Sequence, residues 1–311
     1  MTSKPSFATL ILVGPGELES SRLQDVVTSL LCVEPELREL VLIDDGMACT
    51  QSEVLNWLPM SCKLTILKNP RNGVGDGWAD GTTVGAIFGL KHLATRDDLD
   101  YVLRLDTDSV VFGRFSDRVA QLFQKHPECG MAGTFRKYPS GDDRIKSGYM
   151  IERQTAPYLF VRFLGRLMLT TWRPALLSTA FRRKALIKAA ERRGYTKGEH
   201  VQGGGHAFSA AFVRALDSNH LLDDPFLFFH TRITDDYALT LLGYALGFIA
   251  LDYNRPGEVF AVVNNGLPDS PAALVQRGYA IAHSAKADPR WPEAEIREVF
   301  SKVRQQLVAP A

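Results

Sequence analysis

Asp106 and Asp108 are two carboxylates one residue apart, directly after the apolar run 101–105. Side chains at positions i and i+2 of an extended segment point the same way, so a strand that ends here aims both carboxylates at one place. Mg²⁺ and Mn²⁺ prefer oxygen ligands and are often held by one or two carboxylates together with substrate phosphates. The spacing therefore predicts a cation site that serves a nucleotide diphosphate. A solvated turn is the alternative reading, because so short a motif also occurs by chance.

The elements expected to position this pair alternate along the first half of the chain. Four apolar runs have the character of strands: 9–13, 40–43, 63–67 and 101–105. Three segments between them space their apolar residues as helices do: 20–33, 51–58 and 78–93. This alternation predicts an α/β fold with a doubly wound, mainly parallel sheet, whose ligand crevice lies at the carboxyl ends of the strands. Asp44, Asp45, the Gly-rich loop 69–77 and the Asp106/Asp108 pair all follow such ends.

The pattern changes in the second half, after an expected helix at 116–125 and strand at 130–135. Residues 144–198 carry thirteen Lys or Arg against two Glu, with an amphipathic stretch at 158–172. This basic insert fits a packed helical lid with a solvated face, a surface for an anionic bilayer, or a site for an acidic glycan. Further elements are expected beyond it: a strand and helix at 206–216, a helix at 237–247, a strand at 248–253 and a terminal helix at 292–307.

The overall composition is that of an ordinary globular protein. The chain has 311 residues, 36 Lys and Arg against 35 Asp and Glu, and 45% hydrophobic residues. Nothing in it resembles a nucleic-acid-binding module, so nucleic-acid partners are not expected. The four cysteines show neither zinc spacing nor a disulfide framework, and there is no signal segment or long apolar stretch. We therefore expect a cytoplasmic protein, with peripheral membrane contact through 156–184 as one use of the basic insert.

Two regions carry a resemblance to a known class. Residues 9–57 are similar to the start of the family 2 inverting glycosyltransferases, which have the GT-A fold, and include the turn Ile43-Asp44-Asp45-Gly46. The loop Gly14-Pro15-Gly16-Glu17 departs from the Pro and Tyr-Asn that usually follow the first strand of that family. The segments Gly203–Ser209 and Thr234–Leu239 resemble both family 2 and the fringe-like transferases. The resemblance fails over 138–200.

This resemblance implies a metal-dependent, inverting glycosyltransferase. The donor would be a nucleoside diphosphate sugar, with a UDP-sugar favoured, and the acceptor a hydroxyl of a glycan, a lipid-linked molecule or a small molecule. Asp106, Asp108 and His283 would hold Mn²⁺ or Mg²⁺, and Lys286 would touch the diphosphate. For His283, which follows an apolar stretch, an ordinary core or surface histidine is the alternative.

The resemblance also implies roles for the remaining candidates. Asp44 and Asp45 would accept hydrogen bonds from the nucleoside, with Asp106 shared between metal and ribose, and Arg71 would contact the base or diphosphate. Asp236 would be the catalytic base and Asp235 its orienting partner. Each has a structural alternative: a turn before Gly46, a flexible loop at 69–77, and a helix start that the two aspartates merely stabilise.

We expect a single domain of four segments: a nucleotide-sugar-binding half (1–135), the basic insert or lid (136–200), an acceptor-binding and catalytic half (201–290) and a C-terminal helix (291–311). Two alternatives remain. A sugar-phosphate nucleotidyltransferase shares the wound sheet and uses a cation, but needs a Gly-rich loop with Arg and Lys after the first strand, which residues 14–22 only faintly suggest. A catalytically inactive homologue that binds glycans or partners is the other.

Overall fold

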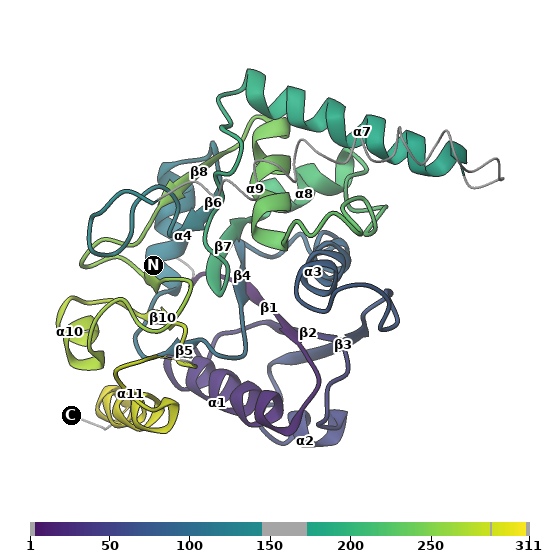
Figure 1. The fold of residues 1–311 in the computed structure, drawn as a ribbon. Helices are drawn as coiled ribbons and strands as arrows, with labels where there is room; N and C mark the ends of the chain where they lie inside the picture. Colours follow the sequence, from purple (N-terminus) through teal and green to yellow (C-terminus); the bar gives the residue numbers. More distant parts are fainter. Residues whose placement is uncertain (1–3, 145–172, 287, 309–311) are drawn as a thin grey trace.

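The computed structural model describes residues 4–144, 173–286 and 288–308. A seven-stranded sheet lies at its centre, with the strand order β3-β2-β1-β4-β7-β6-β8 (Figure 1). Its strands are β1 (Phe7–Val13), β2 (Glu39–Asp44), β3 (Lys63–Lys68), β4 (Tyr101–Leu105), β6 (Cys129–Gly133), β7 (Gly205–Ser209) and β8 (Ile249–Asp252). Neighbouring strands run parallel except where β7 pairs with β4 and with β6. The predicted mainly parallel α/β sheet is therefore confirmed.

Helices cover both faces of this sheet. Successive strand residues point to opposite sides, so each face contributes side chains to a core of its own. Leu10 of β1 packs with α3 (Ala79–Leu93), α8 (Ala210–Ser218) and α9 (Asp235–Leu246). Its neighbour Ile11 packs in a second core with α1 (Glu17–Val33) and α4 (Ser116–Lys125). The short helix α2 (Gln51–Leu55) connects β2 to β3. The sheet is thus doubly wound, as the alternation of elements predicts.

A smaller sheet of three strands lies beside the large one, in the order β5-β10-β9. It contains β5 (Val110–Val111), β9 (Phe260–Val262) and β10 (Ile281–His283), and it packs with α10 (Pro271–Gln276) and α11 (Glu293–Val308). Stacking of Phe112 on Phe300, with ring centroids 4.2 Å apart, ties α11 to it. Because β10 pairs antiparallel with β5, two residues after Asp108, this sheet brings His283 to the end of β4.

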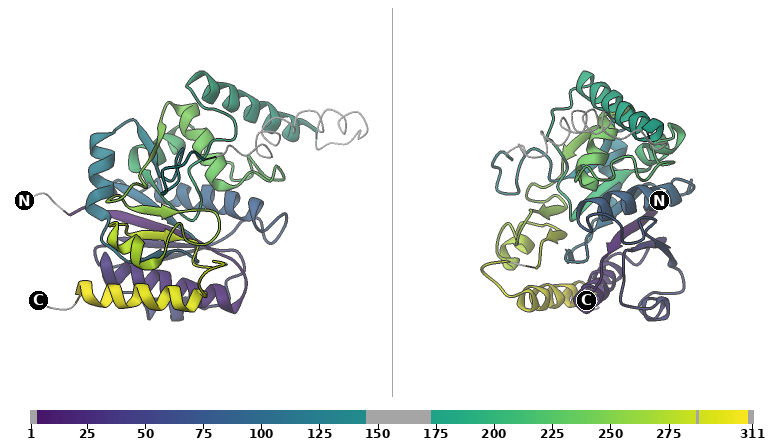
Figure 2. Two further views of the ribbon diagram at one scale, coloured as in Figure 1. Left: turned by 60° about the vertical axis from the view of Figure 1, so that its left-hand side comes forward. Right: turned by 45° about the vertical axis from the view of Figure 1, so that its right-hand side comes forward.

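Residues 145–172 of the basic insert lie outside the described residues, and with them the whole amphipathic stretch expected at 158–172. The described helix of the insert is α7 (Arg173–Arg192), which runs along one edge of the molecule next to α9 (Figure 2). Leu186, Ile187 and Ala190 of α7 pack on the core shared with α9. Within the described ranges, no helix is both long and apolar enough to cross a bilayer.

The predicted elements agree with the structure to within a few residues, with two informative differences. The helix expected over 51–58 ends at Leu55. More important, the segment that carries Asp106 and Asp108 is a tight turn and not an extended strand end, since Ser109 N donates to the Asp106 carbonyl 3.1 Å away. The two carboxylates converge because the chain reverses between β4 and β5.

Candidate functional site

A cleft of about 420 Å³ opens at the carboxyl ends of the parallel strands. Its walls come from distant parts of the chain: the ends of β1 and β2, the start of α3, the turn after β4, the loop before β7, the start of α9 and the end of β10. Seven of the predicted site residues line it: Asp45, Asp106, Asp108, Asp235, Asp236, His283 and Lys286. Parallel strands end at one edge of a sheet, which is why residues so distant in sequence meet here.

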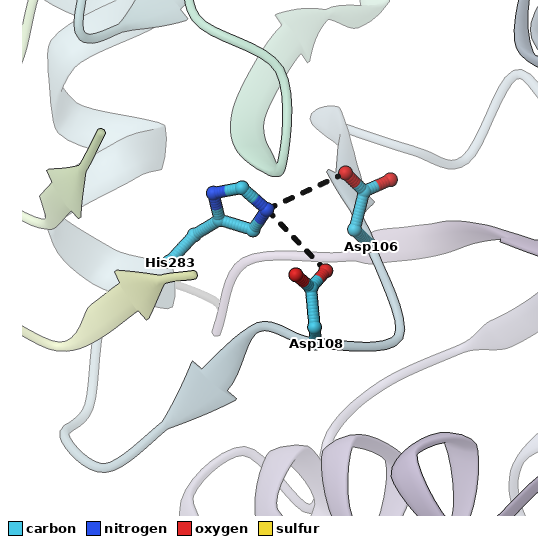
Figure 3. Close-up of side chains that lie close together, drawn as sticks. All are labelled: Asp106, Asp108 and His283. Carbon is cyan, nitrogen blue, oxygen red and sulfur yellow. Dashed lines mark ion pairs between the residues drawn. The ribbon is translucent and has the colours of Figure 1, made fainter. Parts of the chain in front are cut away.

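Asp106, Asp108 and His283 form one cluster in this cleft, with a ligand atom of each lying within 4.8 Å of the others. His283 Nε2 lies 3.3 Å from Asp108 Oδ1 and 3.6 Å from Asp106 Oδ2 (Figure 3). Two carboxylates and one imidazole suit a divalent cation such as Mn²⁺. The sequence-predicted ligand set is thus assembled in space.

The hydrogen bonds around His283 fix its orientation toward the two aspartates. Its Nδ1 donates to the Val263 carbonyl at 2.9 Å, because a carbonyl can only accept, and this leaves Nε2 directed at the carboxylates. Burial alone would lower the pKa of His283, yet the neighbouring Asp108 and Asp106 carboxylates raise it above its ordinary value. A metal-ligating histidine commonly has this arrangement, with the second nitrogen bound to a backbone carbonyl.

Asp108 gives the clearest test of whether these residues fit a cation. Its side chain is 1% exposed, and Oδ1 is buried without a hydrogen-bond partner, whereas Oδ2 accepts from Ser284 Oγ at 2.5 Å. Lys286 Nζ lies 3.3 Å from the same Oδ2. Burial raises the pKa of Asp108, but His283, Lys286 and Ser284 together hold it well below its usual range. Oδ1 makes no hydrogen bond, and the group that faces it is the His283 ring, with Nε2 3.3 Å away. A buried, ionised oxygen needs a cationic partner, and a metal ion held between Asp108, Asp106 and His283 would supply one.

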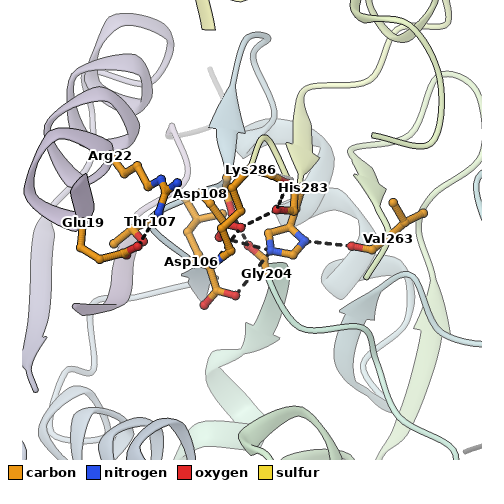
Figure 4. A network of polar contacts seen from close by, with 12 residues as sticks. Glu19, Arg22, Asp106, Thr107, Asp108, Gly204, Val263, His283 and Lys286 are labelled. Atoms are coloured by element: carbon orange, nitrogen blue, oxygen red, sulfur yellow. Dashed lines mark hydrogen bonds and ion pairs between the residues drawn. The ribbon is translucent and has the colours of Figure 1, made fainter. Parts of the chain in front are cut away.

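The turn that carries these carboxylates is braced from α1. Thr107 donates to Glu19, which in turn forms an ion pair with Arg22 at 2.6 Å (Figure 4). Arg22 also binds Glu293 of α11 at 2.6 Å. Gly204 accepts a hydrogen bond from Asp106 N at 3.0 Å on the other side. Both edges of the Asp106–Asp108 turn are therefore held by elements far away in sequence.

Asp236 lies at the start of α9 and is held by several donors. Oδ1 accepts from Thr234 Oγ1 and from Tyr237 N at 2.9 Å, and Oδ2 accepts from Gly203 N at 3.1 Å. Thr234 stands at the N-cap position, but its hydroxyl binds Asp236 and caps no backbone N–H. Burial raises the pKa of Asp236, and the hydrogen bonds from Thr234 and Tyr237 oppose that rise.

Asp235 faces the metal cluster through an arginine. Arg104 Nε lies 3.2 Å from Asp235 Oδ2, and Arg104 Nη1 lies 2.7 Å from Asp106 Oδ1. Burial raises the pKa of Asp235 to about 6, although the Arg104 charge opposes this. A carboxylate with a pKa near neutrality suits proton transfer at cellular pH.

The residues predicted to bind the nucleoside divide into two groups. Asp45 lines the cleft and forms a two-pronged ion pair with Arg71, with Nε–Oδ1 and Nη2–Oδ2 distances of 2.7 and 2.6 Å. Arg71 itself does not line the cleft. Asp44 Oδ1 accepts from the backbone N–H groups of Gly46 and Met47, at 2.9 and 2.7 Å, as expected of a turn.

Sequence reasoning gave no role to two residues of the site, Arg104 and Ser284. Arg104 interrupts an apolar strand, and an arginine at such a position is a signal that the sequence contains. Ser284 gives no comparable signal. The sequence singles out the segment Gly203–Ser209, but it does not show that Gly204 lies against His283. Gly204 has φ +95°, and a methyl group there would lie less than 3.0 Å from the His283 ring, so only glycine leaves room for the histidine.

No family model matches the chain, and no curated protein matches its sequence. Among solved structures it is similar to the galactosyltransferase LgtC in complex with donor and acceptor sugar analogs, at 11% identity and a TM-score of 0.49, covering 98% of this chain and 97% of that one. It is similar to mouse xyloside xylosyltransferase 1 in its apo form, at 10% identity and a TM-score of 0.42, over 83% and 88% of the two chains. It is also similar to the mannosyltransferase Ktr4p from S. cerevisiae, at 12% identity and a TM-score of 0.39, over 80% and 69%.

All three are glycosyltransferases, the class that the sequence resemblance named. With TM-scores of 0.49 or less, these similarities are distant.

Proposed function

We propose that this protein is a metal-dependent, inverting glycosyltransferase that moves a sugar from a nucleoside diphosphate sugar, with UDP-sugars the first candidates, to an acceptor hydroxyl. One observation carries the proposal. The cluster of half-buried Asp106 with buried Asp108 and His283, in which Asp108 Oδ1 makes no hydrogen bond, lies in the same cleft as the buried pair Asp235 and Asp236. A cation site and a separate proton-accepting site are the two parts that transfer from a sugar diphosphate requires.

The donor would lie between the Asp106–Asp108 turn and the end of β2. Asp106, Asp108 and His283 would hold Mn²⁺ or Mg²⁺, which when bound neutralises the leaving diphosphate as a Lewis acid. Lys286, whose side chain is 49% exposed and whose Nζ lies 3.3 Å from Asp108 Oδ2, would contact a phosphate oxygen. Asp45 would accept a hydrogen bond from the nucleoside, and its ion pair with Arg71 would fix its orientation. Asp106 would be shared between the cation and the ribose, and Asp44 would support the turn next to Asp45.

The acceptor would enter from the side of Asp235 and Asp236. Asp236 would take the proton of the acceptor hydroxyl as that oxygen bonds to the anomeric carbon, while the bond from that carbon to the diphosphate oxygen breaks and the nucleoside diphosphate leaves. Asp235 would orient the acceptor or Asp236. A single displacement of this kind inverts the anomeric configuration.

We propose one transferase domain in which residues 1–135 bind the donor and 201–290 hold the acceptor, with 136–200 as a basic lid and 291–311 as a terminal helix. The acceptor would be a glycan, a lipid-linked molecule or a small molecule. A cytoplasmic location with peripheral membrane contact through 156–184 is consistent with the basic residues of that segment.

Calorimetric titration with UDP, GDP and dTDP, with and without Mn²⁺, tests the donor site. Binding of UDP that requires Mn²⁺ supports the transferase, whereas a preference for a nucleoside triphosphate supports a nucleotidyltransferase, and absence of any nucleotide binding would overturn both. Asp108→Ala should abolish the Mn²⁺-dependent binding. Anomeric proton NMR of the product then decides inversion against retention.

Asp236→Asn tests the acceptor side separately. This variant should bind UDP and Mn²⁺ as the wild type does, because Asp236 lies outside the metal cluster, while transfer is lost. Unchanged turnover in Asp236→Asn would remove Asp236 from the role of base.

A further inference from the structure

Arg104 is a buried cation that needs an explanation. It lies in β4, in a run of otherwise apolar residues, and it is 2% exposed. Taking a guanidinium group out of water costs several kcal/mol unless anionic partners surround it. Its side chain nevertheless reaches the cleft wall. A buried arginine at this position therefore requires anionic partners, and packing alone does not explain it.

The partners of Arg104 come from both functional groups of the cleft. Nη1 donates to Asp106 Oδ1 at 2.7 Å and to the Leu105 carbonyl at 2.5 Å. Nε donates to Asp235 Oδ2 at 3.2 Å. One planar group thus contacts a residue of the metal cluster and a residue of the carboxylate pair.

The contact with Arg104 leaves the second oxygen of Asp106 facing His283. Because Arg104 binds Oδ1 of Asp106, Oδ2 remains directed at His283, 3.6 Å from Nε2. The guanidinium group is rigid and offers donors at fixed angles, so it sets the orientation of both carboxylates and not merely their charge.

The neighbour of Arg104 across the sheet does not compete for these carboxylates. His206 pairs with Arg104 in the β4–β7 ladder and is fully buried. Burial and the adjacent Arg104 charge lower the pKa of His206 to about 3, which keeps its ring neutral.

We propose that Arg104 is a positioning residue that holds Asp106 of the metal cluster and Asp235 of the carboxylate pair in one rigid unit, so that cation site and acceptor site keep a fixed relation. The role of Asp235 in this inference rests on the proposed function. The effect of Arg104 on the metal cluster does not. Arg104 itself takes part in no bond that forms or breaks.

The substitution Arg104→Lys tests it, because lysine keeps the positive charge but offers a single nitrogen in place of a fork. Titration with Mn²⁺ alone, followed by electron paramagnetic resonance, should show affinity about 10- to 100-fold weaker, the usual effect of losing a partner that orients a ligand. Arg96→Lys is the control. It removes a fork on Asp98, with Nε–Oδ1 and Nη2–Oδ2 distances of 2.8 Å each, outside the cleft, and should leave Mn²⁺ binding unchanged. Wild-type Mn²⁺ affinity in folded Arg104→Lys would overturn the inference.

A double-mutant cycle of Arg104→Lys with Asp235→Asn tests the contact between Arg104 and Asp235. If Arg104 acts through Asp235, the two losses in kcat should be strongly non-additive while KM for the donor changes little. Additive losses would overturn the link to Asp235.

If the wild type transfers no sugar at all, the proposed function fails, and the Mn²⁺ titration still decides the role of Arg104. Should Arg104→Lys fail to fold, as judged by circular dichroism, Asp235→Asn provides the second variant. Release of one edge of Arg104 should then weaken Mn²⁺ binding measurably, and unchanged affinity would count against the bridge.

Discussion

Gly204→Ala is the sharpest perturbation of the metal cluster, because it adds a single methyl group. Gly204 has φ +95°, and the added carbon would lie less than 3.0 Å from three atoms of the His283 ring. The ring must therefore move, which breaks the Nδ1 hydrogen bond to the Val263 carbonyl and turns Nε2 away from Asp106 and Asp108. Alanine at Gly204 should remove the histidine from the ligand set without changing any ligand.

The chain provides a matched control for the backbone strain. Gly194 has φ +90° and nothing within 4 Å of an added carbon, so Gly194→Ala carries the strain without the clash. A left-handed conformation costs an L-residue about 1–2 kcal/mol, and overpacking adds about 1–3 kcal/mol. With an unfolding entropy of about 2.1 cal/mol/K per residue for 311 residues, each kcal/mol shifts Tm by roughly 1.5 °C. Gly194→Ala should thus melt about 2 °C below the wild type and Gly204→Ala about 3–7 °C below it.

The assay is thermal melting with and without Mn²⁺ plus UDP. A ligand at 100 times its Kd stabilises the folded state by about 2.7 kcal/mol, which corresponds to roughly 4 °C in this chain. We expect that increment in the wild type and in Gly194→Ala, and its loss in Gly204→Ala. An increment in Gly204→Ala equal to that of the wild type would refute the reasoning that His283 completes the cation site.

Three further predictions concern other parts of the molecule. Ser284→Ala removes the 2.5 Å hydrogen bond to Asp108 and should weaken Mn²⁺ binding about 10- to 100-fold by calorimetry. Ser284→Thr keeps the hydroxyl and should lose less affinity, and equal losses in the two variants would contradict this prediction. Burial raises the pKa of Asp235 to about 6, and the protonated carboxyl cannot assist as an anion, so kcat should fall as the pH decreases through 6. A kcat that stays constant from pH 5 to 8 would count against the role of Asp235 and Asp236. Glu34 accepts hydrogen bonds from Phe115 N, Ser116 N and Ser116 Oγ at 2.5, 2.9 and 2.7 Å, so Glu34→Ala should lower the free energy of unfolding by about 1.5–3 kcal/mol in urea, with little change in Mn²⁺ affinity.

Local patterns predicted the elements of the fold because those patterns record which side of each element is buried. The run Tyr101–Leu105 and the helix Ser116–Lys125 have the same bounds in the sequence prediction and in the structure. The helix expected over 51–58 is shorter because its last residues form turns, with Trp57 N bonded to the Val54 carbonyl at 3.0 Å. Such end points depend on the next element in space, which local spacing does not record.

The candidate ligands could be chosen from the sequence, but the reason for their convergence could not. Asp106 and Asp108 were expected to point the same way from a strand, and they meet across a turn instead. That turn is fixed by Thr107 bound to Glu19 and by Gly204, contacts that join distant parts of the chain.

The sequence by itself determined the alternation of strands and helices, the strand ends that carry acidic residues, and the type of chemistry that these residue types allow. Only the tertiary structure decided which of them share a cleft. The β5–β10 pairing brings His283 to Asp108, and Arg104 joins Asp106 to Asp235. It also separated Asp45, which faces the cleft, from Asp44, which closes a turn. Side-chain direction and long-range pairing arise from packing between elements, and packing is a property of the whole fold.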